Sequence, residues 1–159
     1  MTFRIYTPDP VIDVRRREIL NAVLLDDDAQ GAANPWDVAC TADGRWICVS
    51  HSGTQELSVI DARALLDSLQ RRPLEAFSNA AFFGMSSSYY GFGPTSSGED
   101  IVNVPGFLAG LRQRVKLPGV GPRGLAVRGS QVYVAEYFTD SVAAVTVAPE
   151  KEATVRSLA

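Results

Sequence analysis

The sequence predicts an all-β fold built from repeated, four-stranded antiparallel sheets. An internal repeat is the first observation behind this prediction, because residues 34–61 and residues 121–146 pass through the same order of strand-like segments and turns. Pro35 in the first copy corresponds to Pro122, which lies 87 residues later. The second observation is that the strand-like segments are almost wholly apolar, as in Trp-Ile-Cys-Val at residues 46–49. Continuous apolar strands indicate sheets that are covered on both faces.

The first copy contains three predicted strands that are separated by short turns. We expect these strands at residues 36–41, 45–50 and 56–61. Asp43-Gly44 lies between the first two, and Asp-Gly between apolar runs is a strong hairpin signal. The second copy turns at residues 128–130 instead, and the spacing between the copies falls from 87 to 85 residues across this turn. Each copy is therefore expected to form one antiparallel meander.

An insertion at residues 62–111 interrupts the first copy after its third strand, and a helix is expected to open it. Asp61 can cap this helix at its N-terminus. Apolar residues then recur at the spacing of one helix face, at Ala62, Leu65, Leu66 and Leu69. The segment 71–73, Arg-Arg-Pro, ends the helix and places cations at the negative end of its dipole.

The rest of the insertion reads as a long loop that returns to the sheet. Residues 77–100 are rich in serine, glycine and aromatic residues, and a loop of this length is uncommon unless it is functional or disordered. Residues 104–111 are expected to form a short helical turn. Residues 114–117 read as the fourth strand of the first sheet. This short helical and loop insertion accounts for the long spacing between the two copies.

The blade count indicates an incomplete ring. Residues 1–159 are predicted to form a single partial β-propeller domain, which has an outer strand at 17–25, a first blade at 34–118 and a second blade at 121–158. These make slightly more than two blades of the β-propeller type, whereas propellers close with about four to eight. Repeats that cannot bury their faces alone need neighbours. We therefore expect either a piece of a larger propeller or a chain that completes itself by association.

Composition excludes several classes of partner. The net charge of −3 and the isoelectric point near 5.1 provide no basic field for nucleic acid. No run of about 18 apolar residues is present, so no membrane span is expected. Residues 1–8 contain no apolar core of a signal peptide. Two alternatives remain open, a cytoplasmic protein or a chain that lacks the start of a longer secreted one.

The two cysteines are expected to be free thiols. If the turn at 42–44 joins two antiparallel strands, Ala39 lies opposite Cys48 and Cys40 lies opposite Ile47. Side chains alternate between the two faces of a sheet along a strand. Cys40 and Cys48 then project from opposite faces, whereas a disulfide needs Cβ atoms about 3.5–4.5 Å apart.

His51, the only histidine, is the first candidate for chemistry. A functional interpretation makes it a metal ligand, a haem ligand or a general base. A metal site needs about three or four ligands, and no second histidine accompanies it. Its counterpart in the second copy is Glu136, which favours a structural, hydrogen-bonding role near a blade end. The sequence contains no nucleophile–base pair, so neither a catalytic residue nor a metal site is predicted.

The remaining candidates are binding residues. Asn34 and Arg123 occupy positions where groups that face the central channel of a propeller would lie. Tyr89, Tyr90 and Phe92, in the aromatic and serine-rich loop, could form a recognition surface, because tyrosine offers rigid contact area with a polar tip. The alternative for that loop is a flexible insertion packed loosely over a blade edge.

The two copies resemble the YVTN-type β-propeller repeat of bacteria. The resemblance rests on the Pro–small–apolar strand, the Asp-Gly turn and the Ser-Val-Ile-Asp strand, from Pro35 to Asp61 and more divergently from Pro122 to Val147. Three further segments are similar to a subgroup of large exported propellers that carry or neighbour a dihaem cytochrome c peroxidase-like module: residues 31–36, 104–108 and 115–123.

The resemblance implies a function that lies largely outside this chain. It implies a non-catalytic scaffold or protein-interaction segment of a larger exported protein, in a redox context and beside a cytochrome or peroxidase-like partner. It also implies a periplasmic or extracellular location for full-length relatives. No Cys-x-x-Cys-His haem motif occurs here, so we expect no cofactor in this chain. The alternative is a lactonase-like propeller enzyme whose site needs further blades.

Overall fold

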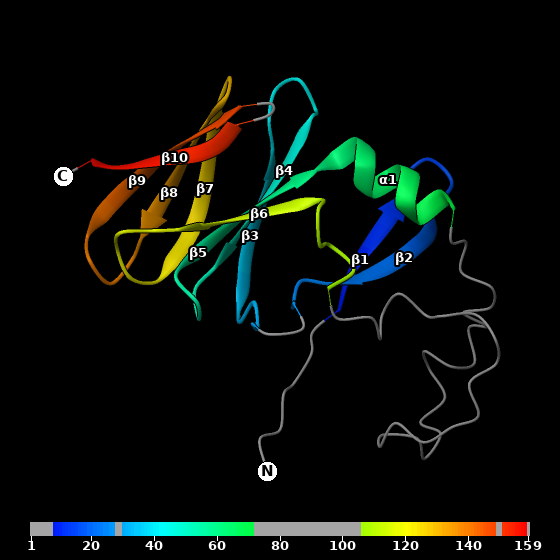
Figure 1. Cartoon of the computed structure of the whole chain (residues 1–159), viewed down its shortest axis with the longest axis horizontal. Coiled ribbons are helices and arrows are strands. Elements are labelled where there is room, and N and C mark those ends of the chain that lie inside the picture. Colours follow the sequence, from blue (N-terminus) through cyan, green and yellow to red (C-terminus); the bar gives the residue numbers. More distant parts are fainter. Residues whose placement is uncertain (1–7, 28–29, 72–105, 149–150, 159) are drawn as a thin grey trace, which may run out of the picture.

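The computed structural model describes residues 8–27, 30–71, 106–148 and 151–158, and they form three antiparallel sheets (Figure 1). Two of these sheets have four strands each, and we call them the first and second blade. The third sheet is a two-stranded ribbon near the N-terminus. In Figure 1 the second blade lies on the left, the first blade in the centre and the ribbon on the right. The predicted all-β, blade-type fold is confirmed.

Strand order within each blade follows the chain. The first blade contains β3 (Pro35–Cys40), β4 (Trp46–His51), β5 (Glu56–Asp61) and β6 (Arg112–Lys116), in the order β3-β4-β5-β6. The second blade contains β7 (Pro122–Arg128), β8 (Gln131–Glu136), β9 (Ser141–Ala148) and β10 (Lys151–Leu158), in the order β10-β9-β8-β7. The ribbon pairs β1 (Pro8–Asp13) with β2 (Glu18–Leu24). These bounds lie within about two residues of the strands predicted at 36–61 and 114–117.

The insertion begins with the predicted helix, α1 (Ala62–Gln70). The Asp61 carboxylate caps it by accepting a hydrogen bond of 2.9 Å from the Ala64 amide. Ala62, Leu65 and Leu69 are buried, while Leu66 is 40% exposed, so the apolar face is narrower than predicted. The loop at 77–100 lies outside the described residues. Residues 106–111 form consecutive hydrogen-bonded turns that lead into β6.

One strand was not predicted from the sequence. The segment 17–25 was expected to be a single outer strand, and it is β2, but β1 pairs with it along its length. β1 contains Pro8 and Pro10. Proline cannot donate to a sheet ladder and is confined to edge strands, which hides this strand from a periodicity argument.

The backbone repeats its irregularities as faithfully as its strands. A register shift falls between Pro35 and Val38 in the first blade and between Pro122 and Leu125 in the second. The residue before each proline has a positive φ, 54° at Asn34 and 71° at Gly121. Two segments of modest sequence similarity therefore adopt the same conformation, including its unusual φ values.

The two blades pack face to face through an apolar interface. Its members come from β4, β5, β6 and the residue after β6 in the first blade and from β8 and β9 in the second, and most are no more than 1% exposed. They are Cys48, Leu57 and Val59 with Val115 and Leu117 from the first blade, and Val132, Val134, Ala143, Val145 and Val147 from the second. Burial of one such valine or leucine side chain contributes roughly 1.5–3 kcal/mol to folding. The blades therefore stabilise each other by covering faces that would otherwise meet water.

A second apolar cluster covers the opposite face of the first blade. The ribbon and α1 supply Val23, Leu25, Leu65 and Leu69, which pack on Val49 and Ile60 of the first blade and on Leu108. In Figure 1, α1 and the ribbon lie on the side of the first blade that faces away from the second. The central strands of the first blade are thus covered by the second blade on one face and by the ribbon and α1 on the other.

Polar contacts fix the register between the two blades near their inner strands, β3 and β7. The Asp37 carboxylate accepts a hydrogen bond of 2.8 Å from the Leu125 amide. The Ser50 hydroxyl donates to the Arg123 carbonyl at 2.6 Å and accepts from the Asp37 amide at 3.1 Å. Ser50 is fully buried, so its hydroxyl is a bridge that water cannot replace easily.

Replacing Ser50 should weaken the junction between the blades. Ser50→Ala leaves the Arg123 carbonyl and the Asp37 amide without this partner, so we expect a loss of about 1–3 kcal/mol in the free energy of unfolding. Chemical denaturation monitored by tryptophan fluorescence measures it. Ser52→Ala, in the following turn, is the matched control and should change little. Equal stability of the two variants would contradict this role for Ser50.

The hairpin register predicted for the cysteines is confirmed. Ala39 pairs with Cys48 and Cys40 with Ile47, and both cysteines are free. Cys40 is exposed, whereas Cys48 is fully buried in the interface between the blades. Burial, with a smaller contribution from the nearby Cys40 thiol, raises the pKa of Cys48 to about 12. The thiolate, which is the reactive form, is therefore suppressed at Cys48.

Thiol labelling should separate the two cysteines. In the folded chain at pH 8 we expect a small thiol reagent to modify Cys40 rapidly and Cys48 only at the rate of unfolding, because Cys48 is buried and protonated. Mass spectrometry of digested protein counts the labels at each site. Both sites should react in denaturant without prior reduction. Rapid labelling of Cys48 in the folded chain would show that the interface is open.

Candidate functional site

The structure places the predicted binding residues in two separate environments. His51 ends β4 and is fully buried. Asn34 and Arg123 lie at the starts of β3 and β7, near the inner edge of the blades. Tyr89, Tyr90 and Phe92 lie outside the described residues.

Arg123 lies among three aromatic rings, and we call these four residues the aromatic cluster. Its guanidinium carbon is 4.4 Å from the ring centroid of Trp36, 4.0 Å from that of Tyr137 and 5.4 Å from that of Phe138. A cation within about 6 Å of an aromatic centroid is attracted by the ring quadrupole, by about 0.5–2 kcal/mol per contact. The guanidinium is therefore held in place by the rings.

The fold brings the cluster together from three segments. Trp36 and Arg123 occupy equivalent positions of the repeat, 87 residues apart, and each lies in the register shift at the start of its strand. Tyr137 and Phe138 come from the turn between β8 and β9. Their rings meet edge to face, with centroids 5.2 Å apart and planes at 83°.

Gly121 allows the turn to fold onto the start of β7. The Tyr137 amide donates to the Gly121 carbonyl, and the Phe138 amide donates to the Val120 carbonyl, both at 3.0 Å. Gly121 has a φ of 71°, and a Cβ atom there would overlap the Phe138 ring. The first blade has the same pair of backbone contacts, from Ser52 to Asn34 and from Gly53 to Ala33, but no aromatic side chains in this turn.

The aromatic cluster is unusually exposed for its composition. Trp36, Tyr137 and Phe138 are 58%, 59% and 64% exposed. Within the described part of the chain, no carboxylate lies within ion-pairing distance of Arg123. Contiguous exposed apolar surface on a folded protein commonly marks an interaction site. The cluster therefore offers an aromatic surface with a positioned cation that has no acidic partner among the described residues.

Sequence reasoning identified only part of this cluster. Arg123 was predicted together with Asn34. Asn34 is exposed, and its carbonyl accepts a hydrogen bond from the Ser52 amide in the turn after β4. Trp36, Tyr137 and Phe138 are not among the binding residues predicted from the sequence. The sequence offers one signal for the aromatic cluster, Tyr-Phe in a turn where the first copy has Ser-Gly. This signal becomes informative only once the turn is known to fold back beside Arg123.

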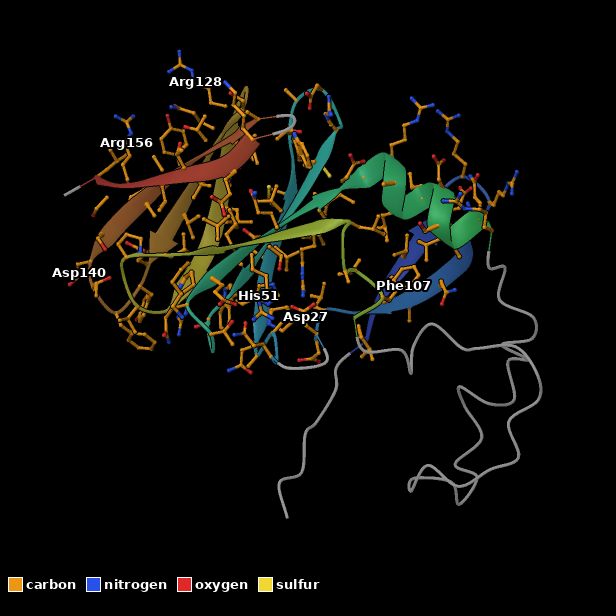
Figure 2. All side chains as sticks on the ribbon, viewed as in Figure 1. Asp27, His51, Phe107, Arg128, Asp140 and Arg156 are labelled. Atoms are coloured by element: carbon orange, nitrogen blue, oxygen red, sulfur yellow. The ribbon has the colours of Figure 1, made fainter. Side chains whose placement is uncertain are left out.

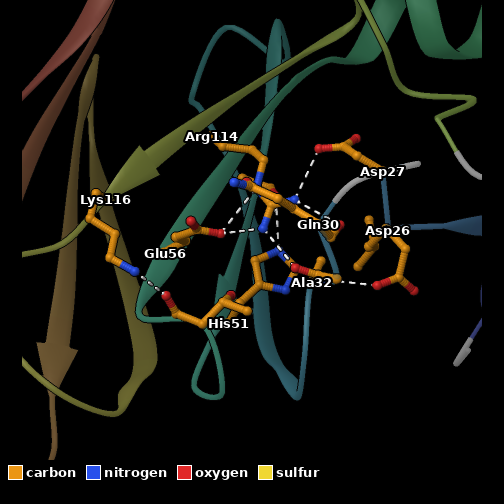
Figure 3. Close-up of polar contacts among 12 residues, drawn as sticks. Asp26, Asp27, Gln30, Ala32, His51, Glu56, Arg114 and Lys116 are labelled. Carbon is orange, nitrogen blue, oxygen red and sulfur yellow. Dashed lines mark hydrogen bonds and ion pairs between the residues drawn. The ribbon is translucent and has the colours of Figure 1, made fainter. Parts of the chain in front are cut away.

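His51 belongs to a buried polar region formed with residues of β5 and β6 in the first blade (Figure 3). Its Nε2 lies 2.8 Å from the Ser58 hydroxyl. Beside it, Arg114 bonds to Glu56 at 2.5 Å through Nη2 and to Asp27 at 2.9 Å through Nη1. Arg112, whose side chain is 2% exposed, also pairs with Asp27. Figure 2 shows Asp27 and His51 on the same side of the first blade.

These arginines fasten the linker between β2 and β3 to the outer strand β6. Arg114 donates to the carbonyls of Gln30 and Gly31, at 3.1 and 2.7 Å, and Arg112 donates to the carbonyl of Leu25. Charge-assisted hydrogen bonds of this kind are about twice as strong as neutral ones. The carboxylates of Asp27 and Glu56 are therefore already engaged by guanidinium groups.

Glu136 has an equivalent task in the second blade. It corresponds to His51, and it is 1% exposed. Its carboxylate accepts hydrogen bonds from the Gly119 amide at 2.6 Å and from the Ser141 hydroxyl at 2.7 Å. Gly119 is the repeat equivalent of Ala32. Glu136 thus ties the linker that leads into the second blade to the end of β8.

The environment of His51 keeps its ring neutral. Burial, followed by the positive charges of Arg112 and Arg114, lowers the pKa of His51 to about 4. A neutral imidazole at pH 7 fits the structural role that its hydrogen bond to Ser58 indicates. Over the residues that the structure describes, no three side chains of the metal-binding types gather in one place. Likewise, no helix in the described ranges is long and apolar enough to cross a membrane.

Because the pKa of His51 is lower in the folded state than in the unfolded state, acid should destabilise the fold. Folding stability is complete above the unfolded pKa of about 6.5 and is lost progressively as the pH falls toward 4. Between pH 7 and pH 5 we expect the wild type to lose about 2 kcal/mol more than His51→Gln, which cannot titrate. Denaturant melts at both pH values measure the difference.

Ser58→Ala is the matched control for this prediction. It removes the hydroxyl partner but keeps the buried imidazole, so it should retain the pH dependence. If His51→Gln and the wild type showed the same change between pH 7 and pH 5, His51 would not be neutral and buried in solution.

Comparison with known proteins supports the fold and goes no further. No protein-family model matches the chain, and no curated protein matches it. Among solved structures, it is similar to the Kuenenia stuttgartiensis hydrazine synthase, with a TM-score of 0.62 and 17% sequence identity. The alignment covers 87% of this chain and 34% of that chain, so this chain spans about a third of the length of the hydrazine synthase chain that it matches. At this identity the likeness shows the fold alone, and the fold is β-propeller-like.

Proposed function

We propose that the chain is a non-catalytic β-propeller segment that acts as a scaffold and binds a protein partner through the aromatic cluster. The single observation that carries this proposal is the exposed arrangement of Trp36, Tyr137 and Phe138 around Arg123. Tryptophan, tyrosine and arginine are the residue types enriched at the centres of protein interfaces. No comparably exposed aromatic group occurs elsewhere in the described ranges.

The chemistry of the cluster defines the kind of partner. The stacked guanidinium is already positioned, so little side-chain entropy is lost when its remaining N–H groups bind an acceptor. The rings around it would cover apolar surface on the partner. We therefore expect the partner to present a carboxylate next to an apolar or aromatic residue. Arg123 gives this surface a local positive charge, although the chain as a whole has a net charge of −3.

The wider setting of this proposal comes from the family resemblance. The similarity of both copies to the YVTN-type repeat supports a larger exported bacterial protein in a redox context, beside a cytochrome or peroxidase-like partner. The likeness to a part of the hydrazine synthase chain supports a propeller-like domain within a larger protein. The other blades of such a propeller, or a second copy of the chain, are partners at the sheet faces rather than at the aromatic cluster.

Site-specific photo-crosslinking in cells that produce the protein tests the binding surface. A benzoylphenylalanine at position 137, which is 59% exposed, should give a discrete crosslinked product with one partner. The same group at position 128, an exposed residue that Figure 2 shows pointing outward from the second blade, should give none. Arg123→Ala should reduce the product at position 137 about tenfold or more, since loss of a central interface arginine costs about 2 kcal/mol.

Arg123→Lys and a stability measurement complete this experiment. Lysine keeps the charge but loses the planar stacking, so we expect most of the binding to be lost with Arg123→Lys as well. Denaturant melts of both variants measure the stability that the lost ring contacts cost, so that this loss is separated from the loss of binding. A crosslink at position 137 that both variants leave unchanged would refute the proposed role of the cluster.

A further inference from the structure

A pocket opens between the two blades, at the end of their interface that lies away from the aromatic cluster. It has a volume of about 450 Å³, and its lining comes from β4, β5, β6 and the turn before β6 in the first blade and from β9 and β10 in the second. The aromatic cluster includes the turn before β9, whereas this pocket includes Val147 and Ala148 at the other end of that strand. Clefts of about 300–1,000 Å³ between packed units commonly hold small molecules. We call this cleft the inter-blade pocket.

The inner part of the inter-blade pocket is apolar. The half-buried indole of Trp46 forms one side. Val59 and Val147, one from each blade, are the most buried apolar lining residues, at 1% and 3% exposed. The guanidinium of Arg112, another lining residue, is already bound to Asp27. A bound molecule would therefore meet an apolar surface that neither blade provides alone.

A β-bulge shapes the rim of the pocket on the side of the second blade. The register between β9 and β10 shifts there, so that Glu152 and Ala153 both stand opposite Val147. The ladder between β5 and β6, which forms the other side, has no such shift. The Ala153 amide donates across the interface to the Gln113 side-chain oxygen on β6, at 2.7 Å. Bulges re-aim side chains and are over-represented beside binding and active sites.

The rim carries both hydrogen-bond acceptors and hydrogen-bond donors. Glu152 and Lys151 are exposed, and neither forms an ion pair with another residue that the structure describes. Asp61, from the opposite blade, uses one carboxylate oxygen to cap α1 and retains the other. The side-chain oxygen of Gln113 is occupied by the Ala153 amide, so its NH2 group remains as a donor. Two acceptors and two donors thus surround one apolar recess.

We propose that the inter-blade pocket binds a zwitterion with an apolar side chain, that is, an apolar amino acid or a dipeptide of such residues. The ammonium group binds Asp61 and Glu152, the carboxylate binds Lys151 and the Gln113 NH2 group, and the side chain packs on Trp46. Hydrogen bonds between ionised partners are about twice as strong as neutral ones. A ligand with only one of the two charges would leave half of the polar rim without a partner. This proposal does not depend on the aromatic cluster, which lies at the other end of β9.

Isothermal titration calorimetry of the full chain tests the ligand class, with L-phenylalanine and L-leucine as probes. We expect at least one of them to bind with a Kd below about 1 mM. N-acetylphenylalanine lacks the ammonium group and phenylalaninamide lacks the carboxylate, so each should bind about tenfold or more weakly than phenylalanine. Absence of binding by both amino acids would overturn the proposal. So would equal binding of phenylalanine and its two blocked forms.

Charge-matched variants test whether the ligand occupies the inter-blade pocket. Glu152→Gln and Lys151→Gln remove one charge each from exposed positions, so the fold should survive and binding should weaken about tenfold. Asp140→Asn and Arg156→Gln make the same charge changes elsewhere on the second blade, at residues that Figure 2 shows away from the first blade, and they should leave binding unchanged. Equal effects of the pocket variants and the control variants would refute the assignment.

The emission of Trp46 gives an independent readout of position. In a Trp36→Phe chain Trp46 is the only tryptophan, and its emission should shift with the same Kd that calorimetry gives. Heat of binding without a shift would place the ligand outside the pocket and contradict the proposal.

Two dipeptides distinguish the sources of this ligand chemistry. Phe-Gly and Gly-Phe keep both charges and the side chain but move the ammonium and carboxylate groups apart. About tenfold weaker binding of both than of phenylalanine would assign the pocket to a free amino acid. Tighter binding of either would assign it to a dipeptide. The same binding of glycylglycine, which has no side chain, would overturn the role of the apolar recess.

Discussion

The packing of one apolar sheet face against another is the constraint on which the rest of this structure depends. The central strands β4 and β5 of the first blade carry apolar residues on both faces, so this blade alone in water would leave them uncovered, at a cost of about 25 cal/mol for each Å² of apolar surface. The interface centred on Leu57, Val59, Val132 and Val145 removes that cost for one pair of faces. By fixing β3 beside β7, it also brings Trp36 next to Arg123, although 87 residues separate them.

Polar groups at the blade ends follow from the same packing. Parts of the linkers between stacked blades are buried, and buried backbone groups need hydrogen-bond partners. The second blade satisfies its linker with a carboxylate, Glu136, whereas the first uses the guanidinium groups of Arg112 and Arg114. The single histidine, which a sequence would offer first for chemistry, is buried and hydrogen-bonded to Ser58.

Two surfaces remain exposed after this packing. The aromatic cluster lies at the rim of the contact between the two blades, where the turn of the second blade adds Tyr137 and Phe138. On the other face of the first blade, Val38 is 63% exposed at a position where its counterpart Leu125 is partly buried.

Sequence alone was sufficient wherever one short segment contains the whole signal. The repeat predicted the blades, the Asp-Gly turn predicted a register that places Cys40 opposite Ile47, and Asp61 predicted the start of α1. These features depend on alternation and on turn chemistry, which act over a few residues. The strand β1 escaped prediction because Pro8 and Pro10 obscure its pattern, and its partner supplies the hydrogen bonds that define it. Only the tertiary structure decided the aromatic cluster, because the cluster depends on which sheet faces meet. A contact between residues 87 positions apart leaves no trace in local periodicity.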